Sequence, residues 1–309
     1  MQLKYRQVHK PVKNADNEEV VDKILNLTKH DTAKIVNSGN SSILLAMSNV
    51  KGKIVLPDQG AWHGFKQAAR LLNKEIVILP TDNGLVNKEH LELIPDEDCA
   101  LFLTSFAGYT AEQNMKEISK YCKKENITLV EDVSGSISDP EKKLSNGRYS
   151  DIIVGSTGSP KMINAGYGGF ITTSIPDFFK DSNYLVNCLK VNSDIVSQIN
   201  TELDYVEDNF IKTVDACDYI KKELMDYVVH ADKRGVNVIF ESGGGNVSRM
   251  LRDDIKLDNG KGMITRCPNY NRLKVKGFAL EVKNLDIVSL RKDNLDEIIN
   301  IIKRRIFGN

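Results

Sequence analysis

Between residues 19 and 175, short unbroken runs of apolar residues alternate with segments in which apolar residues recur every three or four positions. The unbroken runs are typical of strands buried on both faces, and the wider spacing is typical of amphipathic helices. Strands are predicted at residues 54–56, 76–79, 100–103, 127–130, 152–154 and 169–172, and helices at residues 19–29, 40–47, 64–72 and 111–125. This alternation predicts an α/β fold, with a mostly parallel central sheet and helices on both faces.

After residue 176 the pattern becomes less regular. Two helices are predicted at 177–196 and 202–229, then strands at 236–240 and 278–282, and a closing amphipathic helix at 294–305. These elements indicate a smaller α+β domain. The predicted division is an N-terminal arm with a helix, a large domain, and connecting helices with a small C-terminal domain, at residues 1–35, 36–180 and 181–309.

Charge and composition narrow the possible partners. The chain has 42 lysine and arginine residues and 42 aspartate and glutamate residues, so 42 − 42 gives a formal net charge of zero. A surface that coats nucleic acid needs a basic excess, so a nucleic-acid partner is not expected. No apolar run approaches the ~20 residues that span a bilayer, so no membrane partner is expected, and no secretory signal is readable. The five scattered cysteines form no Cys-x-x-Cys pair, which predicts reduced thiols in a cytoplasmic protein without a metal site.

Polar residues at predicted strand ends are candidates for chemistry, because such sheets bind ligands beyond the carboxyl ends of their strands. Lys161 follows a loop with the hydroxyls of Ser156 and Thr157, which suit a phosphate, although a lone loop lysine is usually solvated. Asp132 ends the neighbouring strand beside Glu131, and adjacent strand residues point to opposite faces. A carboxylate and a lysine at neighbouring strand ends indicate a cationic heterocycle between them. Pyridoxal phosphate needs this pair, a lysine for the Schiff base and an aspartate to keep the pyridine nitrogen protonated.

Two further segments are candidate ligand contacts. The turn at residues 38–42, Ser-Gly-Asn-Ser-Ser, opens a predicted helix. Such a turn either binds an anion through free N–H groups and the helix dipole or is an ordinary N-cap. Trp62 and His63 follow the strand at 54–56, where Trp62 is placed to stack on a planar ligand, whereas a tryptophan is most often part of the core.

The order of these motifs resembles the fold-type I pyridoxal-phosphate enzymes. It runs Ser-Gly-Asn-Ser-Ser, Pro-x4-Trp-His, Glu-Asp-x-Ser-Gly-Ser, and Ser-x4-Lys followed by Gly-x-Gly-Gly-Phe. The chain is most similar, over residues 35–175, to the aminotransferase family of sugar-nucleotide and antibiotic biosynthesis that is named for DegT, DnrJ, EryC and StrS. The separation of Asp132 and Lys161, 161 − 132 = 29 residues, is the one expected of that family.

The resemblance implies a role for each matching residue. Lys161 would form the Schiff base and shuttle the proton, and Asp132 would pair with the pyridinium nitrogen. Trp62 or His63 would stack on the cofactor ring. The phosphate would be held by Gly39, Asn40, Ser41 and Ser156. Proteins of the family are generally homodimers with the site at the subunit interface, so a homodimer is expected.

The chain departs from the family pattern beside the aspartate. The family usually has a glutamine or histidine three residues after it, near the phenolic oxygen of the cofactor. This chain has Gly135 there, so Ser134, Ser136 or no residue takes that role.

The substrate side also departs from related enzymes. Amino-acid aminotransferases of this fold bind the substrate carboxylate with an arginine late in the small domain, and the predicted strand 278–282 has none. Arg266 and Arg272 are the nearby candidates, although surface arginines are the simpler interpretation. Tyr109 either donates a hydrogen bond to a substrate group or forms an aromatic lid.

The predicted activity is that of a pyridoxal-phosphate-dependent aminotransferase, which moves an amino group to a small keto or keto-sugar acceptor. The alternatives are a lyase, a desulfurase or an aminoacyl-tRNA-modifying transferase with the same cofactor, or a non-catalytic paralogue. A desulfurase needs a cysteine in a mobile loop near the cofactor, and Cys267 is the candidate, although a structural thiol is the simpler interpretation.

Overall fold

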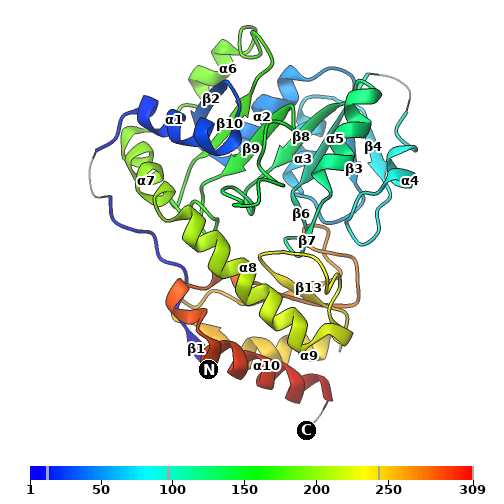
Figure 1. Cartoon of the computed structure of the whole chain (residues 1–309), viewed down its shortest axis with the longest axis vertical. Helices are drawn as coiled ribbons and strands as arrows, with labels where there is room; N and C mark the ends of the chain where they lie inside the picture. The colour runs from blue at the N-terminus through cyan, green and yellow to red at the C-terminus, as the bar shows by residue number, and fades with distance from the viewer. Residues whose placement is uncertain (12–13, 96–97, 243, 308–309) are drawn as a thin grey trace.

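A seven-stranded sheet forms the centre of the protein. The computed structural model describes residues 1–11, 14–95, 98–242 and 244–307. The strands of this sheet are β2 (Thr32–Val36), β3 (Lys53–Pro57), β4 (Ile76–Leu79), β5 (Cys99–Thr104), β8 (Thr128–Asp132), β9 (Ile152–Ser156) and β10 (Gly169–Thr173). Their order is β2-β10-β9-β8-β5-β3-β4 (Figure 1). The pairs among β9, β8, β5, β3 and β4 are parallel, and β10 is antiparallel to both of its neighbours.

Helices cover both faces of this sheet. They are α1 (Asn17–Thr28), α5 (Met115–Lys124) and α7 (Ser193–Leu203) on one face, and α2 (Gly39–Asn49) and α3 (Gly64–Leu71) on the other. Alternate strand residues enter the two cores, with Val55 and Leu101 under the first face and Ile54 and Phe102 under the second. Both faces are buried, which is why these strands are apolar at nearly every position. The predicted α/β class is confirmed.

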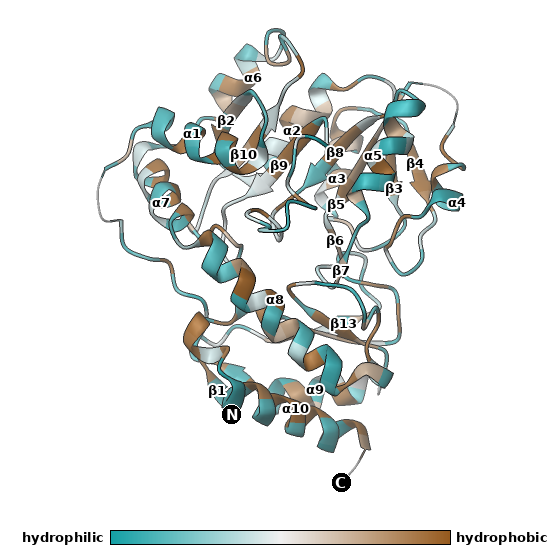
Figure 2. Cartoon of the chain, in the orientation of Figure 1, coloured by the Kyte–Doolittle hydropathy of each residue, from teal (hydrophilic) through white to brown (hydrophobic). Residues whose placement is uncertain are grey.

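The C-terminal region has its own sheet and core. The long helix α8 (Val206–Glu223) leads into it. Its main elements are the antiparallel strands β11 (Val238–Phe240), β13 (Ile264–Cys267) and β14 (Gly277–Leu280), with the helices α9 (Gly244–Asp254) and α10 (Lys292–Phe307). The rings of Phe240 and Phe278 stack with centroids 4.8 Å apart inside this core. The α10 ribbon alternates between hydrophobic and hydrophilic residues in Figure 2, as expected of a helix with one buried face.

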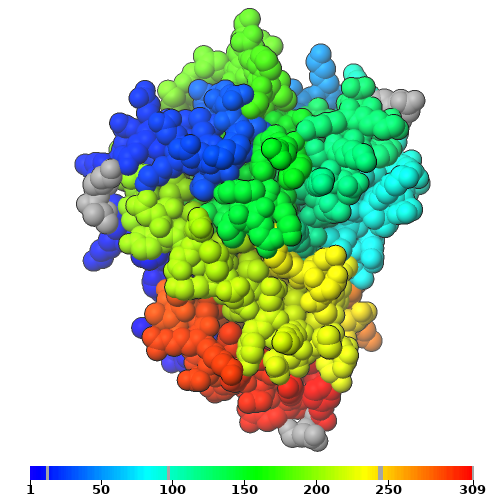
Figure 3. All heavy atoms as spheres, in the orientation of Figure 1, coloured from blue at the N-terminus to red at the C-terminus, as the bar shows by residue number. Residues whose placement is uncertain are grey.

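The chain begins within this C-terminal region. Strand β1 (Gln2–Leu3) pairs in parallel with β12 (Lys256–Leu257), and both Leu3 and Tyr5 are part of the C-terminal core. The first residues and the end of α10 lie at the same end of the molecule (Figure 1), where the yellow-to-red part of the chain forms one body in Figure 3. The predicted domain boundaries remain predictions, although β2 runs across the one placed at residues 35–36.

Three predicted helices differ clearly from the observed ones. The helix predicted at 202–229 is shorter, since α8 begins at Val206 and ends at Glu223. Side-chain caps explain where the helices at the other two positions begin. The helix predicted at 111–125 begins at Met115, because Asn114 caps it and β7 (Ala111–Glu112) precedes it. The single helix predicted at 177–196 is wrong. The chain forms the short α6 (Asn183–Cys188) and then α7, which Asn192 caps by accepting a hydrogen bond from the amide of Ile195. The remaining short elements are α4 (Lys88–Leu91), β6 (Phe106–Ala107), and 3₁₀ turns at Met225–Tyr227, Val282–Asn284 and Ile287–Ser289.

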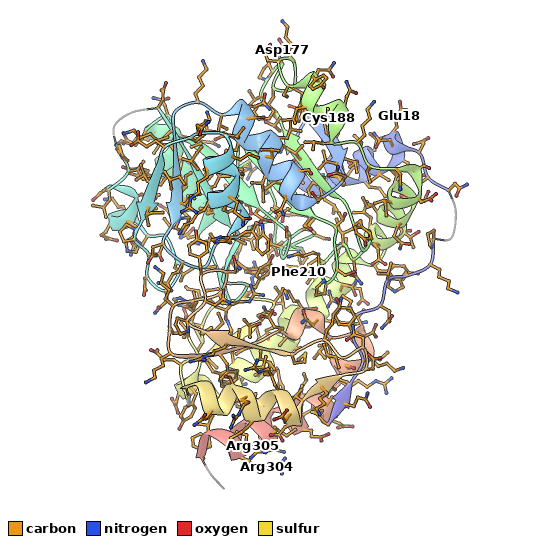
Figure 4. All side chains as sticks on the ribbon, turned by 180° about the vertical axis from the view of Figure 1, so that it is seen from behind. Glu18, Asp177, Cys188, Phe210, Arg304 and Arg305 are labelled. Atoms are coloured by element: carbon orange, nitrogen blue, oxygen red, sulfur yellow. The ribbon has the colours of Figure 1, made fainter. Side chains whose placement is uncertain are left out.

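Helix α8 joins the two regions. Its Phe210 stacks on Phe106, with ring centroids 6.1 Å apart, and Figure 4 shows Phe210 between the two parts of the molecule. Arg304 and Arg305 lie at the opposite end from Cys188 in the same view.

In the described part of the chain, no helix is long and apolar enough to cross a membrane. The described residues also contain no group of three or more histidine, cysteine or acidic side chains that could hold a metal ion.

Candidate functional site

A cavity of about 370 Å³ lies at the carboxyl ends of β8 and β9. Asp132 is the last residue of β8 and Ser156 the last residue of β9, and both line it. Lys161 enters it from the loop after β9, and the first turn of α2 forms another wall. Its volume lies within the range of about 300–1,000 Å³ that is usual for small-molecule sites. The strand-end crevice predicted from the sequence is therefore a real cavity that contains the predicted aspartate and lysine.

The first turn of α2 is packed tightly against the end of β9. The side chain of Ser38 caps the helix by accepting a hydrogen bond from the amide of Ser41 at 3.1 Å. A Cβ atom on Gly39 would lie 2.5 Å from Cβ of Ser156, so only glycine allows this approach. Gly39, Asn40 and Ser156 line the cavity. The first turn of a helix has N–H groups without intrahelical partners and a positive dipole end, so this wall can bind an anion.

Ser41 lies away from the cavity lining. Its hydroxyl bonds to Oγ of Ser38 at 2.8 Å and to Oδ1 of Asn37 at 2.5 Å. The side chain that follows it, Ser42, is part of the lining instead. Ser41 therefore shapes the turn, and the structure does not bring its side chain together with the other predicted phosphate contacts.

The structure separates Trp62 from His63. Trp62 is half-buried, lines the cavity, and donates from Nε1 to Oδ1 of Asn40 at 2.8 Å. This bond fixes the indole beside the N-terminus of α2. His63 is exposed, and its ring meets the edge of Tyr270 with centroids 5.9 Å apart. Of these two stacking candidates, Trp62 is the one at the cavity.

Asp132 is buried and held in place by one serine. Its Oδ1 accepts hydrogen bonds from the amide and the hydroxyl of Ser134, at 2.9 and 2.6 Å. The hydroxyl of Ser134 in turn accepts from the amide of Ser156 at 2.9 Å, which joins the ends of β8 and β9. Burial raises the pKa of Asp132, whereas the Ser134 hydrogen bonds and Lys161 oppose the rise. A cation placed against this carboxylate would be strongly stabilised, because water does not screen it there.

The neighbouring acid, Glu131, points to the other side of the sheet, as the alternation of strand side chains predicts. Its carboxylate accepts hydrogen bonds from the hydroxyls of Ser105 and Ser150, at 2.7 and 2.5 Å, and from the amide of Ser145 at 3.0 Å. Glu131 therefore has a structural role inside the core.

Lys161 points toward two aromatic rings. Its Nζ donates to the hydroxyl of Tyr109 at 2.7 Å and lies 6.0 Å from the centroid of the Trp62 ring. Burial lowers the pKa of Lys161, Arg272 adds to the shift, and Asp132 opposes it. A lysine with a lowered pKa more readily supplies the neutral amine that attacks a carbonyl.

Tyr109 occupies the space next to Gly135. An added Cβ on Gly135 would lie 2.8 Å from two carbons of the Tyr109 ring. This is the position at which the family resemblance implies a glutamine or histidine. Ser134 bonds to Asp132, and the hydroxyl of Ser136 bonds to Ser105 inside the core. Burial raises the pKa of Tyr109, and Asp132 adds to the rise, so its hydroxyl stays protonated.

The C-terminal region supplies two cations to the cavity. Arg272, in the loop between β13 and β14, and Lys283, after β14, both line it. The buried carboxylate of Glu281 accepts from Nε and Nη2 of Arg272, at 2.8 and 2.9 Å, and from Nζ of Lys283 at 2.8 Å. Burial lowers the pKa of Lys283 to about 8, although Glu281 opposes the shift. Arg272, Lys283 and Glu281 together carry two positive charges and one negative charge. Their net positive charge is available to an anionic ligand.

Arg266 lies elsewhere. It is an exposed residue of β13, and it is absent from the cavity lining that the described residues form. Lys283 was missed by sequence reasoning. The signal that points to it is its place just after an apolar strand, two residues beyond the buried acid Glu281.

The set of groups around the cavity suits pyridoxal phosphate. An anion site, an aromatic ring, a buried carboxylate and a lysine are what its phosphate, its ring, its nitrogen and its aldehyde require. Gly39 lets the first turn of α2 lie directly against Ser156, so the helix N-terminus and the end of β9 form one wall of the cavity.

Comparison with solved structures identifies the fold as pyridoxal-phosphate fold type I. A DegT DnrJ EryC1 StrS aminotransferase from Brucella abortus matches with a TM-score of 0.73 at 13% identity, covering 94% of this chain and 90% of that chain. Serine palmitoyltransferase of Sphingomonas wittichii matches at 0.70 and 13%, covering 98% and 80%. The SepCysS–SepCysE N-terminal domain complex matches at 0.70 and 15%, covering 95% and 86%. Other matching structures of serine palmitoyltransferase contain pyridoxal phosphate.

The family follows from the sequence match. The sequence model of the DegT/DnrJ/EryC1/StrS aminotransferase family matches residues 13–198, which is more than half of the chain. The chain belongs to this family, and the predicted resemblance is confirmed. A second model, the MJ1341 family C-terminal domain, matches residues 207–303, which begin in α8 and end in α10.

Proposed function

We propose that this protein is a pyridoxal-phosphate-dependent aminotransferase in which Lys161 binds the cofactor covalently. The observation that carries the proposal is the meeting of Lys161, Asp132 and the N-terminus of α2 at one cavity. These three come from separate parts of the sequence, and each suits a different group of the cofactor. Bound pyridoxal phosphate would supply an aldehyde that condenses with amines, with loss of water, and a ring that accepts electrons from the substrate.

Each residue has a definite task in this proposal. Asp132, oriented by Ser134, holds the proton on the ring nitrogen. Gly39, Asn40 and Ser156 hold the phosphate, and Trp62 stacks on the ring. Once the substrate amine has replaced it, Lys161 takes a proton from the Cα atom of the substrate and returns it to the cofactor carbon. The lowered pKa of Lys161 favours this task, since the amine must be neutral to accept a proton.

The charges of the cavity favour a substrate with a carboxylate. Arg272 uses Nε and Nη2 on Glu281 and Nη1 on the carbonyl of Asn271, which leaves further N–H groups in a cavity that it lines. Lys283 lies beside it, so a carboxylate would meet two cations. An amino acid such as glutamate fits as the amino donor. A small keto or keto-sugar compound is the acceptor expected of the family.

The desulfurase alternative requires a cysteine thiol at the cavity, and its candidate, Cys267, lies elsewhere. Cys267 is buried in β13 and is not part of the cavity lining formed by the described residues. Burial raises the pKa of Cys267, which disfavours the reactive thiolate. A lyase uses the same groups as an aminotransferase, so the test below separates the two reactions.

The homodimer is part of the same proposal. Tyr167 is a large aromatic residue that is 73% exposed, in the segment that leads into β10. Its carbonyl accepts a hydrogen bond from Thr157, the residue after Ser156. The expectation of a homodimer comes from the family, whose members generally have the site at the subunit interface, and a second copy of the chain would there cover the ring of Tyr167. Light scattering tests this, and a monomeric mass for the holoprotein contradicts it.

The visible absorption of the purified protein mixed with pyridoxal phosphate tests the function. We expect an absorption band that Lys161→Ala abolishes, and a mass increase on Lys161 after borohydride reduction. Glutamate should convert the cofactor to its amine form, whereas a retained band with elimination products indicates a lyase. Asp132→Asn should retain the band and lose most turnover, because the ring nitrogen is no longer held protonated. A band that survives Lys161→Ala overturns the proposal.

A further inference from the structure

Gly135 has no side chain, and the ring of Tyr109 lies where one would be. Cβ atoms essentially never approach another carbon at 2.8 Å, yet a Cβ on Gly135 would lie that close to both Cδ1 and Cε1 of Tyr109. Gly135 follows Asp132 in the turn after β8, whereas Tyr109 lies in the turn between β6 and β7. Two segments of the chain therefore compete for one space beside Asp132, and an aromatic ring from the more distant segment fills it.

Tyr109 is held rigidly in an uncommon backbone conformation. Its φ angle is +64°, in the left-handed region that non-glycine residues rarely adopt. Its carbonyl accepts hydrogen bonds from the amides of Val236 and Asn237, both at 2.9 Å. The next carbonyl, that of Thr110, accepts from the buried Lys221 at 2.6 Å. Such a conformation persists only where the surroundings enforce it, and here the C-terminal region does so.

The hydroxyl of Tyr109 lies at the reacting nitrogen. It accepts from Nζ of Lys161 at 2.7 Å, and its own proton is free to be donated elsewhere. In pyridoxal phosphate, the phenolic oxygen is on the ring carbon next to the one that bears the aldehyde. When Lys161 is joined to that aldehyde, this oxygen lies within hydrogen-bond distance of the lysine nitrogen. A hydroxyl held at Nζ is therefore in the neighbourhood of the phenolic oxygen and can turn its proton toward it.

We propose that Tyr109 fills the place of a side chain at residue 135 and donates a hydrogen bond to the phenolic oxygen of bound pyridoxal phosphate. The inference rests on the proposed function. A donor at this oxygen stabilises its anionic form, which reduces its attraction for the proton on the adjacent lysine nitrogen. The nitrogen then loses its proton at a lower pH. Arg272 and Lys283, 5.1 and 5.5 Å from the centroid of the Tyr109 ring, act in the same direction.

The pH dependence of the visible band of the holoprotein tests this role directly. Tyr109→Phe keeps the ring and removes the donor. A hydrogen bond to a charged group corresponds to about 1–2 pH units, so the midpoint of the spectral titration should rise by that amount. Tyr270→Phe is the matched control, because the hydroxyl of Tyr270 donates to the carbonyl of Pro57 at 3.0 Å and is no part of the proposed machinery. Its midpoint should equal that of the wild type.

A second pair of variants tests the steric half of the inference. Gly135→Ala adds a methyl group where the ring lies and should displace it, which raises the midpoint with the tyrosine hydroxyl still present. Gly262→Ala is its control, because a Cβ there meets nothing within 4 Å. An unchanged midpoint in Tyr109→Phe, with the band still dependent on Lys161, overturns this inference alone. A wild-type protein without a Lys161-dependent band overturns the proposed function as well.

Discussion

Replacing Glu281 by leucine should destabilise the protein strongly. The carboxylate of Glu281 is buried and accepts five hydrogen bonds, two of them from Arg272 and one from Lys283. Leucine has a similar volume, so the change removes charge and hydrogen bonds rather than packing. It leaves the buried Lys283 and the partly buried Arg272 without an anion between them. Breaking a buried ion pair by removing one partner costs about 3–5 kcal/mol.

Urea denaturation followed by circular dichroism measures this loss. The free energy of unfolding should fall by about 3–5 kcal/mol without a change in the dependence on urea concentration. The control is Asp208→Ala, which breaks an exposed pair with Lys212 on α8 at 2.7 Å. Exposed helical pairs contribute only about 0.3–0.5 kcal/mol, so the two variants should differ several-fold.

The pH dependence gives a second check on Glu281. Burial alone would raise the pKa of Glu281, but Lys283 and Arg272 together hold it well below its usual value of 4.5. A carboxylate with a lowered pKa stabilises the fold above its unfolded value, and this stabilisation is lost as the pH falls. The difference between wild type and Glu281→Leu should therefore narrow below pH 4.5. A loss under about 1 kcal/mol at neutral pH would refute the reasoning, because the cations would then need no buried partner.

Two further predictions concern ligand binding. Gly39→Ala should weaken cofactor binding, because its Cβ would lie 2.5 Å from Cβ of Ser156 and force the start of α2 away from β9. Overpacking of this kind costs about 1–3 kcal/mol, which an absorbance titration with the cofactor measures. An unchanged cofactor affinity would contradict the proposed phosphate site. The KM for a carboxylate donor should rise as the pH passes about 8, since burial lowers the pKa of Lys283 to about 8 and its positive charge disappears above that pH. Lys283→Arg keeps the charge and should remove this rise, so a rise that persists in the arginine variant would exclude Lys283 as its source.

The large region could be predicted from the sequence because local pattern and tertiary structure agree there. Strands such as β3 and β5 are buried on both faces, so their apolar runs are unbroken. The carboxyl ends of parallel strands lie at one edge of the sheet, which is why Asp132 and Lys161 could be placed at a common site. The break between α6 and α7 was not predicted, because residues 189–192 contain no proline or glycine and α6 has no buried residue.

The rest of the site depends on long-range packing that no local pattern encodes. Lys283 reaches the cavity because α8 and the C-terminal sheet dock against the loop that carries Tyr109, through the amides of Val236 and Asn237. The sequence around Tyr109 does not reveal its positive φ angle, which these distant contacts enforce. The sequence likewise does not reveal that Trp62 bonds to Asn40 at the cavity whereas His63 packs on Tyr270.

The two regions of the chain contribute different groups to the cavity. Its charged lining residues are Asp132 and Lys161 from the large region, and Arg272 and Lys283 from the C-terminal region. The α2 wall has no charged side chain, so it can hold a cofactor phosphate by hydrogen bonds and the helix dipole alone. The C-terminal cations are fixed by Glu281 and can then serve the substrate. Under the proposed function, changes in the large region should therefore affect cofactor binding first. Changes in the C-terminal region should affect the choice of substrate. Tyr109 connects the two regions, because the C-terminal region holds its backbone while its hydroxyl bonds to Lys161 of the large region.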